Sequence, residues 1–518
     1  MSASPRVVVI GGGIAGLLAA RRHARAGAQV TLLEADDTLG GALRCTDVAG
    51  ITVNAGAEAY STRTGAVDAL IEELGLADQI RSPRAGLSSR LVSAAGTHVA
   101  PVGGMLGIPG HPFSASTRAV IGWRGALRTL VDRVLPGRIG LRPGVTLGQL
   151  VRRRMGRSVT DRLVAPLVGG VHSADPDTVE IASIMPTLPE DLRRHGSLQA
   201  VARARRSGSR TGSTPRHGSA SGAPRGAGTA VHSLAPTMSA LTDAIAQDLQ
   251  ARGGQIRTGA PATSITRQAD GASWTICTSG TQLAAEHLVL ACPPDAAHDL
   301  LHEPAPQVAA AIAPEPAVPV RLVALVLEDR RLDTFPVGTG ALVAPGTPGI
   351  RAKALTHASA KWEHVQSAAG RAHVVRLSYG RPGEALPSVD DAPAIALADA
   401  SAILGVPLRE ADLRGSQVIT WERTMRGASP GRSDRLAELE TLLEGEPDLE
   451  LVGAWRAGTG IEMIVRADAA AADHADTATA AARAADTAPA NASAPSGPHT
   501  ASRPIPSSHP TTATEDRP

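Results

Sequence analysis

The chain has 518 residues, which is long for a single hydrophobic core and predicts two or more domains. Hydrophobic residues make up 43% and charged residues 19%, the balance of a globular protein, and no apolar run reaches the roughly 20 residues that span a bilayer. The net charge of +2 gives no argument for nucleic-acid binding, and three scattered cysteines without a CxxC pair argue against a disulfide framework or a zinc site and favour a cytoplasmic location.

The first predicted element is a strand over residues 6–10, RVVVI, because a short run of valine and isoleucine is typical of a strand buried on both faces. A helix rich in alanine and leucine follows over residues 14–26. The sequence QVTLLEA, residues 29–35, is a second strand. Together the three segments predict a complete βαβ unit.

Between the first strand and the helix lies a GxGxxG motif, Gly11-Gly12-Gly13-Ile14-Ala15-Gly16. In this motif Gly11 permits a tight turn, Gly13 lets the backbone approach a pyrophosphate, and Gly16 lets the helix pack on the strand. The start of the helix offers free N–H groups to phosphates. Glu34 closes the second strand, where a carboxylate can accept hydrogen bonds from ribose hydroxyls. Because these features are in register, the unit is predicted to bind a dinucleotide.

Two further segments of small residues follow this unit. They are Leu39-Gly40-Gly41-Ala42-Leu43-Arg44 and Asn54-Ala55-Gly56-Ala57-Glu58. Both resemble the extended FAD signature of the amine-oxidase-like flavoproteins, in which small side chains let backbone amides reach the flavin. In this context we expect Arg44 to lie near the flavin or the substrate.

Residues 203–230 are basic, rich in serine and glycine, and nearly free of large apolar side chains, so we expect a disordered insertion. A basic docking segment is the alternative. Beyond it the pattern predicts a helix over 236–252 and buried strands over 287–292 and 449–455. Residues 472–518 lack periodicity, and we expect a disordered tail.

The strand predicted over 449–455 is followed by Gly458-Thr459-Gly460-Ile461. In flavoproteins of the two-dinucleotide type, a late unit of strand, glycines and helix returns to the FAD. The N-terminus of such a helix stabilises the negative charge of the reduced flavin. An ordinary turn between strand and helix is the alternative interpretation.

Several segments together are more specific than the glycines. They are 163–183 (LVAPLVGGVHSADPDTVEIAS), 353–362 (KALTHASAKW), 375–381 (VRLSYGR) and the GTGI sequence at 458–461. With them, most of residues 5–471 resembles the protoporphyrinogen and coproporphyrinogen oxidases of haem biosynthesis, in particular the soluble bacterial type.

The resemblance implies an α/β fold with a Rossmann-like FAD-binding domain, a mixed-sheet substrate domain and a helical insertion. The expected FAD-binding domain is discontinuous, over 1–75, 231–300 and 448–471. The substrate domain covers 76–105 and 301–447, and the helical part covers 106–200. The implied activity is the FAD-dependent oxidation of coproporphyrinogen III to coproporphyrin III, with dioxygen reoxidising the flavin. The FAD is expected to be noncovalent, because no cysteine or histidine has an obvious attachment role.

The resemblance and the motifs give the candidate site residues. Those expected to contact the cofactor are Gly11, Gly12, Gly13, Ile14, Ala15, Gly16, Glu34, Ala35, Gly40, Gly41, Arg44, Gly56, Ala57, Glu58, Ala59, Ala262, Trp421, Gly458, Thr459, Gly460 and Ile461. Arg63 and Lys361 are candidates to pair with substrate propionates. No residue is assigned a catalytic role and no metal ligands are expected. A contact with the next enzyme of haem biosynthesis is a further expectation.

The chain also departs from the family pattern. The segment that begins at Trp421 keeps this tryptophan and Met425 but lacks the usual proline, tyrosine and histidine, and Ala467 replaces a usual glycine. The alternatives are therefore oxidation of protoporphyrinogen IX, an amine oxidase or carotenoid desaturase on the same scaffold, and a flavin-binding paralogue without turnover.

Overall fold

The computed structural model describes residues 4–185, 187–208, 230–268, 273–312, 317–426 and 430–486. The chain divides into two units, Met1–Ala470 and Ala471–Pro518, and the fold that follows is that of the first. Most of the predicted insertion (209–229) and of the predicted tail (487–518) lies outside the described residues.

The described ends of these two segments are helical, so the predicted boundaries are wrong there. Residues 203–208 belong to α10 (Leu198–Gly208), and residues 472–486 belong to α19 (Ile461–Asp486). Residues 472–486 are rich in alanine and residues 203–208 in arginine, and both are among the best helix formers. This propensity outweighs the lack of apolar periodicity in the tail and the lack of large apolar side chains in the insertion.

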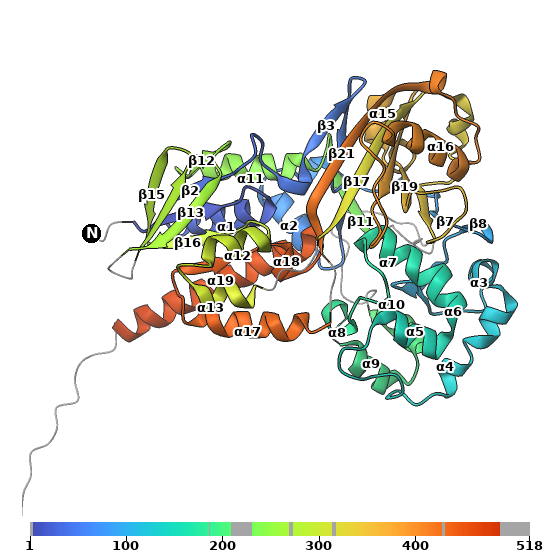
Figure 1. The fold of residues 1–518 in the computed structure, drawn as a ribbon, viewed down its shortest axis with the longest axis horizontal. Coiled ribbons are helices and arrows are strands. Elements are labelled where there is room, and N and C mark those ends of the chain that lie inside the picture. Colours follow the sequence, from blue (N-terminus) through green and yellow to red (C-terminus); the bar gives the residue numbers. More distant parts are fainter. Residues whose placement is uncertain are drawn as a thin grey trace, which may run out of the picture. The chain divides into compact units, whose positions relative to one another are not determined.

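A five-stranded parallel sheet, in the order β12-β2-β1-β16-β22, carries the N-terminal βαβ unit. Its strands come from three distant parts of the chain: β1 (Arg6–Ile10), β2 (Gln29–Leu33), β12 (Gln255–Arg257), β16 (His287–Leu290) and β22 (Leu449–Leu451). Figure 1 shows these strands beside α1 (Ile14–Arg25) and α11 (Ser239–Ala251).

The first strand explains why this sheet is buried on both sides. Val7 and Val9 pack into a core formed with α1, α2 (Ala66–Glu73) and α11, whereas Val8 and Ile10 pack into a second core. The second core includes β14 (Trp274–Thr278), α12 (Pro294–Leu301) and α13 (Pro306–Ala311). Because alternate side chains of a strand point to opposite faces, the unbroken apolar run serves both cores.

A seven-stranded mixed sheet, in the order β21-β17-β20-β19-β18-β7-β8, forms a second structural layer (Figure 1). Neighbouring strands are antiparallel except β18 and β7. The bounds are β7 (Arg90–Ser93), β8 (Gly96–Val99), β17 (Ala317–Leu327), β18 (Gly340–Val343), β19 (Ala354–His357), β20 (His373–Tyr379) and β21 (Leu413–Arg426). One face packs on α16 (Ala392–Leu404). The other packs on α14 (Ala358–Lys361), α15 (Glu363–Ala369) and the hairpin of β3 (Cys45–Val48) and β4 (Ile51–Asn54).

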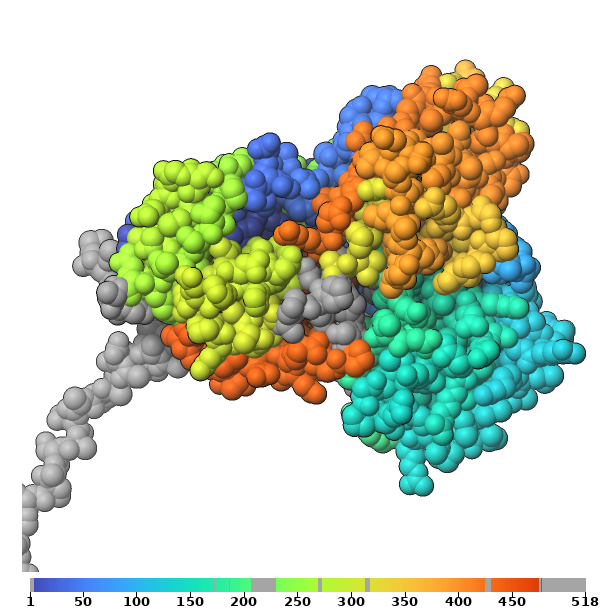
Figure 2. Space-filling model, in the orientation of Figure 1, coloured from blue at the N-terminus to red at the C-terminus, as the bar shows by residue number. Residues whose placement is uncertain are grey.

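Between β8 and β11 (Val231–Leu234), the chain is mostly helical and builds its own apolar core. Its helices are α3 (Ala115–Arg128), α4 (Val131–Val134), α5 (Leu147–Met155), α6 (Arg157–Val159), the π-helix η3 (Thr160–Val164), α7 (Ala165–His172), α8 (Ile181–Ile184), α9 (Leu188–His195) and α10. In Figure 2 these helices, drawn in cyan and green, abut the orange and yellow residues of the mixed sheet. A Cβ on Gly170 of α7 would lie 2.6 Å from Leu342 of β18.

An ion pair that is fully buried organises this helical core. The Nε of Arg154 donates to Asp132 Oδ1 at 2.7 Å, and both side chains are 0% exposed. The remaining guanidinium nitrogens donate to five backbone carbonyls, and Asp132 also accepts the backbone N–H groups of Leu198 and Gln199. Arg154 therefore connects α5 to α4 and to the start of α10.

Apart from the helix α17 (Arg432–Glu444), the remaining elements are short. They are η1 (Gly41–Leu43), β5 (Tyr60–Ser61), η2 (Ala77–Gln79), β6 (Ile80–Arg81), β9 (Gly104–Met105), β10 (Ile108–Pro109), β13 (Ala262–Arg267), β15 (Thr281–Ala285), η4 (Arg330–Thr334), η5 (Glu410–Asp412) and α18 (Ala454–Ala457). In the described part of the chain, none of the helices has the length and apolar character needed to cross a membrane.

The α/β fold class is confirmed, and so are the predicted strand at 6–10 and the helix that follows it. The last predicted strand is wrong in its length. It ends at Leu451 rather than 455, and Trp455 lies in α18. Gly453 has a φ of +136°, a value open mainly to glycine, and the chain turns there instead of continuing as a strand.

Candidate functional site

The glycine loop after β1 is set by close backbone contacts. A Cβ on Gly16 would lie 1.9 Å from Gly11 O, and Gly11 itself has a φ of +113° with Ala291 O 2.8 Å from its Cβ position. A side chain on Gly16 would separate α1 from the end of β1, and a side chain on Gly11 would collide with the backbone that follows β16. Gly11 and Gly16 are therefore required by the packing of the βαβ unit itself.

Gly13 differs from these two glycines. A Cβ on Gly13 would meet no described atom within 4 Å, and its φ of −70° suits any residue. In the described part of the chain no side chain caps α1, and its first turn carries no acidic residue. The start of α1 thus keeps free N–H groups and its positive dipole end beside open space, which is the arrangement that suits a pyrophosphate.

Glu34 follows β2 at the same edge of the sheet. Its carboxylate accepts the backbone N–H of Gly12 at 2.6 Å and that of Asp36 at 2.9 Å. The segment that follows β12 also contacts this residue, since the N–H of Ala260 donates to Glu34 O at 2.9 Å. Glu34 is half-buried, so an oxygen held against the glycine loop can still accept a hydroxyl hydrogen bond.

The second glycine segment lies directly on the first. The N–H of Gly40 donates to Gly12 O at 2.9 Å, and a Cβ on Gly41 would lie 3.3 Å from Gly13 Cα. Gly40 and Gly41 have φ angles of +98° and +54°. The two segments therefore form one continuous backbone surface around Gly13.

Arg44 lies at the end of this surface. Its Nη1 is 3.0 Å from Asp36 Oδ2 and 3.1 Å from Thr38 Oγ1, and its guanidinium carbon lies 5.1 Å from the centre of a ring of Trp421. The Nε1 of Trp421 in turn donates to Ala55 O at 3.0 Å. Trp421 thus connects the longest strand of the mixed sheet to the small-residue segment, and Arg44 is directed toward Asp36.

The third segment, residues 54–58, packs against the second. A Cβ on Gly56 would lie 2.1 Å from Ala42 O, and the N–H of Ala57 donates to the same oxygen at 2.8 Å. The side-chain oxygen of Asn54 accepts the N–H of Met238 at 2.8 Å, before α11. The predicted glycine at position 56 is therefore one that only glycine can occupy.

Glu58 joins this segment to the mixed sheet through three donors. Its Oε1 accepts Lys361 Nζ at 2.7 Å and Trp362 Nε1 at 3.4 Å, and its Oε2 accepts Arg376 Nη2 at 3.1 Å. The Glu58 side chain is 10% exposed. Burial alone would raise its pKa, but the two cations and the hydrogen bonds lower the pKa of Glu58 to about 2.

The late glycine turn supplies the start of another helix. Gly458 and Gly460 have φ angles of +104° and +117°, and α19 begins at Ile461. Ile461 packs in the same core as Ile14 of α1. The buried Glu462 in the first turn of α19 accepts the N–H of Thr64 at 2.8 Å.

The other candidate contacts have less specific surroundings. Ala35 is exposed directly after Glu34, Ala59 is half-buried after Glu58, and Ala262 is half-buried at the start of β13. Of the two substrate candidates, Arg63 is exposed on the loop after β5, whereas Lys361 is paired with Glu58. The ammonium group of Lys361 is thus engaged within the protein.

Two residues of this region did not figure among the predicted ones. Arg376 donates to the backbone oxygens of Asn54 at 3.0 Å and Gly56 at 2.7 Å as well as to Glu58, and it was visible only as the one arginine in an apolar strand. Glu462 places a carboxylate in the first turn of α19, the helix whose N-terminus was expected to stabilise the negative charge of a reduced flavin. The strand and helix patterns alone gave no reason to single out either residue.

These segments resemble known flavoproteins in sequence and in fold. Residues 14–462 match the family of flavin containing amine oxidoreductases. The coproporphyrinogen III oxidase of Mycobacterium leprae is 30% identical over 480 residues, 89% of this chain and 95% of the relative. That of Propionibacterium freudenreichii is 28% identical over 479 residues, 88% of each chain.

The fold comparison agrees with these sequence matches. A structure from Exiguobacterium sp. 255-15, provisionally described as a protoporphyrinogen oxidase, superimposes with a TM-score of 0.76 and 23% identity. The match covers 92% of this chain and 99% of that one. A reduced UDP-galactopyranose mutase gives a TM-score of 0.65 at 15% identity, over 91% of this chain and 95% of that one.

Proposed function

Because the chain belongs to the flavin containing amine oxidoreductase family, we propose that it is an FAD-dependent oxidase that converts coproporphyrinogen III to coproporphyrin III. The observation that carries the proposal is the match to coproporphyrinogen III oxidases, which extends over almost the whole length of both chains. It supports this substrate over an amine or a carotenoid, because relatives of that length and identity share the segments outside the nucleotide fold.

The residues around Gly13 fit an FAD of the kind proposed. The N–H groups at the start of α1 would hold the pyrophosphate, and the carboxylate of Glu34 would accept ribose hydroxyls. Gly40, Gly41 and Gly56 keep the backbone free of side chains along the same surface. A bound flavin would supply the redox chemistry, the oxidation of the porphyrinogen in two-electron steps, and the six electrons and six protons removed would account for three molecules of dioxygen reduced to hydrogen peroxide.

The protein's own contribution is to position and orient. The carboxylate of Glu58 binds Lys361 and Arg376, and Arg376 donates to the backbone of residues 54–56. These contacts fix the position of the small-residue segment 54–58 relative to the mixed sheet. Arg63, exposed at the end of β5, is our candidate to pair with a substrate propionate. We assign no general acid or base.

The experiment is anaerobic mixing of the yellow, purified protein with coproporphyrinogen III, with protoporphyrinogen IX and with primary amines. We expect the flavin absorbance to bleach with coproporphyrinogen III first, and the colour to return with a fluorescent porphyrin and peroxide when air is admitted. Faster bleaching with protoporphyrinogen IX would show that protoporphyrinogen IX, and not coproporphyrinogen III, is the preferred substrate. Bleaching with amines alone, or with dithionite alone, would refute porphyrinogen oxidation.

A further inference from the structure

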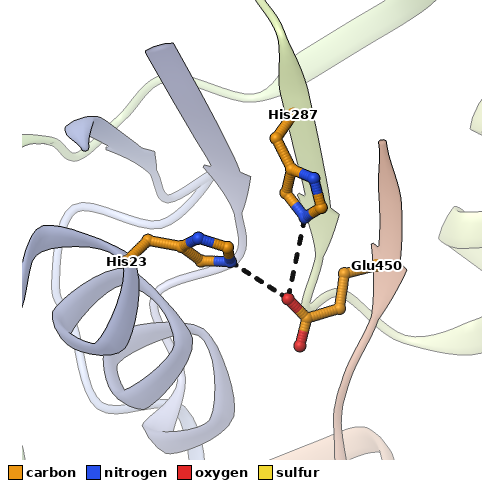
Figure 3. Close-up of side chains that lie close together, drawn as sticks. All are labelled: His23, His287 and Glu450. Carbon is orange, nitrogen blue, oxygen red and sulfur yellow. Dashed lines mark hydrogen bonds and ion pairs between the residues drawn. The ribbon is translucent and has the colours of Figure 1, made fainter. Parts of the chain in front are cut away.

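The side chains of two histidines and a glutamate from three separate elements point toward one another (Figure 3). His23 lies in the last turn of α1, His287 opens β16 and Glu450 lies in β22. The Nε2 atoms of His23 and His287 lie 3.1 Å and 3.8 Å from Glu450 Oε2, and all three atoms are within 4.8 Å of one another. The three side chains are 18%, 23% and 21% exposed.

The surroundings prepare one carboxylate oxygen for a ligand. Arg22 donates to the other oxygen, Glu450 Oε1, at 2.5 Å, and a second nitrogen of Arg22 is 2.9 Å from Asp468 Oδ1. Arg22 therefore fixes the carboxylate, and Oε2, which is hydrogen-bonded to His23 Nε2 at 3.1 Å, faces both imidazoles. Hydrogen bonds to the second oxygen of a ligating carboxylate are the usual support of a metal ligand.

The Nε2 atom of His287 lacks a hydrogen-bond partner in this cluster. Among the described residues, its Nε2 is buried without a hydrogen-bond partner, although it points at an oxygen 3.8 Å away. A buried polar atom without a partner costs free energy, so a native structure normally supplies one. The separation is longer than a hydrogen bond and close to that of two ligands sharing one ion.

We propose that His23, His287 and Glu450 bind a divalent transition-metal ion, with Zn²⁺ as the best fit. Imidazole nitrogen and carboxylate oxygen are ligands that Zn²⁺ takes at about 2.0–2.2 Å, which places two ligands of a tetrahedral ion about 3.4 Å apart. The two separations from Glu450 Oε2, 3.1 Å and 3.8 Å, bracket this value, and the two imidazole nitrogens lie within 4.8 Å of each other. Partial exposure leaves the fourth position to water.

The charges around the cluster are compatible with a dication. Arg22 carries one positive charge, which the carboxylates of Glu450 and Asp468 outweigh, and both imidazoles bind metal in their neutral form. Arg22 Nη1 is 3.5 Å from His23 Nε2 and is the one unfavourable neighbour that we identify. Its pairing with Asp468 reduces that repulsion.

The position of the cluster indicates a structural role that goes beyond the proposed oxidation. His287 is paired in register with Val7 at the start of β1, whereas the glycine loop follows the end of β1. The ion would therefore lie near the starts of the parallel strands, whereas the flavin would lie beyond their ends. It would join α1, β16 and β22, three segments separated by more than a hundred residues each, and so stabilise the folded state by binding it alone.

The test uses the full-length, untagged flavoprotein, stripped with a chelator, dialysed and titrated with zinc sulfate by calorimetry. We expect one tight zinc per chain and a rise of a few degrees in unfolding temperature at saturating zinc. His287→Gln should abolish the tight binding and the temperature rise while changing the metal-free protein little, because the Nε2 of His287 makes no hydrogen bond to the described residues and its contact with Glu450 Oε2 is long, at 3.8 Å.

His298→Gln is the matched control, because His298 is an exposed histidine on α12 whose contact is its neighbour Asp299. This variant should bind zinc like the unaltered chain. Glu450→Gln, a second ligand variant, should also lose tight binding. Equal zinc binding by the unaltered chain and His287→Gln would overturn the proposal and leave the cluster as an ion pair with Arg22. None of these readouts depends on porphyrinogen turnover, so the two proposals fail independently.

Discussion

Gly13 and Gly16 lie three residues apart in one motif, yet the packing of the structure requires glycine only at position 16. Gly16 is required by the backbone of Gly11, whereas Gly13 has space for a side chain. The sequence motif predicts that both glycines matter for binding a dinucleotide. Only the structure shows that packing requires the glycine at position 16, so that a requirement for glycine at position 13 would have to come from a bound ligand.

We therefore predict opposite outcomes for two alanine substitutions. Gly16→Ala forces α1 from β1 and should lower the free energy of unfolding by several kcal/mol, so little folded protein is recovered. Gly13→Ala should fold with nearly unchanged stability but bind flavin weakly, because its methyl group occupies the open space before α1. Urea unfolding and the flavin-to-protein absorbance ratio measure the two effects.

Gly445→Ala is the control for both variants, since this exposed glycine after α17 has a φ of −81° and ordinary contacts. It should keep both stability and flavin. A Gly13→Ala protein that retained its full flavin content at low free FAD would contradict the assignment of the pyrophosphate site.

Glu58 gives a prediction about pH. Glu58→Gln leaves Lys361 and Arg376 without their carboxylate, and breaking a buried ion pair costs about 3–5 kcal/mol of unfolding free energy at pH 7. The folded pKa of Glu58 is about 2, below the roughly 4.3 of an unfolded glutamate. Its stabilisation is thus complete above the unfolded value and is lost as the pH falls toward 2.

The measurement is urea unfolding of both proteins between pH 7 and pH 3. The difference in unfolding free energy should be constant near neutrality and shrink toward pH 3. Glu363→Gln, which removes an exposed carboxylate, should change stability by less than about 1 kcal/mol at every pH. A pH-independent difference for Glu58→Gln would show that the substitution acts through packing.

At the scale of elements, the helical segment depends on one arginine. Arg154→Lys keeps the positive charge but cannot reach Asp132 and the surrounding carbonyls together, because a lysine has one nitrogen where the guanidinium has three. We expect a loss of about 3 kcal/mol or more, confined to the helical segment.

Hydrogen exchange resolved along the chain would check this prediction. Protection should fall in α4, α5 and α10 and stay unchanged in the parallel sheet. Arg153→Lys, at the exposed neighbouring position, should leave all protection unchanged. Uniform loss across both regions would mean that the helical segment does not unfold separately.

The elements that the sequence predicted well are those with strong local signals. The strand of Val7 to Ile10 combines β-branched residues with a glycine stop, and the helix after it is rich in alanine and leucine. Trp455 was placed in a strand because its neighbours are apolar, whereas the conformation of Gly453 ends the strand. Local pattern does not report such a turn, since glycine also occurs within strands.

The contacts of the candidate site were harder to predict than its motifs. Glu58 was expected beside the cofactor from a motif, but its partners Lys361 and Arg376 lie about three hundred residues further along the chain. Pairings of that separation depend on the arrangement of two sheets, which a single sequence does not specify. The same holds for His23, His287 and Glu450, which periodicity treats as three unrelated positions.

For the whole molecule, the parallel sheet predicts different results for two truncations. A chain ending at Asp486 retains β22, the late glycine turn and all of α19, and should keep its flavin and its unfolding temperature. A chain ending at Pro447 loses the edge strand and the late glycine turn, exposes the partner edge of β16, and should aggregate without flavin. Size-exclusion chromatography with flavin absorbance distinguishes the two. Flavin bound by the shorter chain would refute a role for the late turn.

The order in which the strands of the parallel sheet are synthesised also affects how the protein folds during translation. Its middle strand β1 (Arg6–Ile10) is synthesised long before its edge strand β22 (Leu449–Leu451). At about 5–20 residues per second, the ribosome needs roughly 20 to 90 seconds to pass from one strand to the other. The βαβ unit around β1 therefore stays without its edge strand, exposed or chaperoned, until the segment that carries β22 has been made.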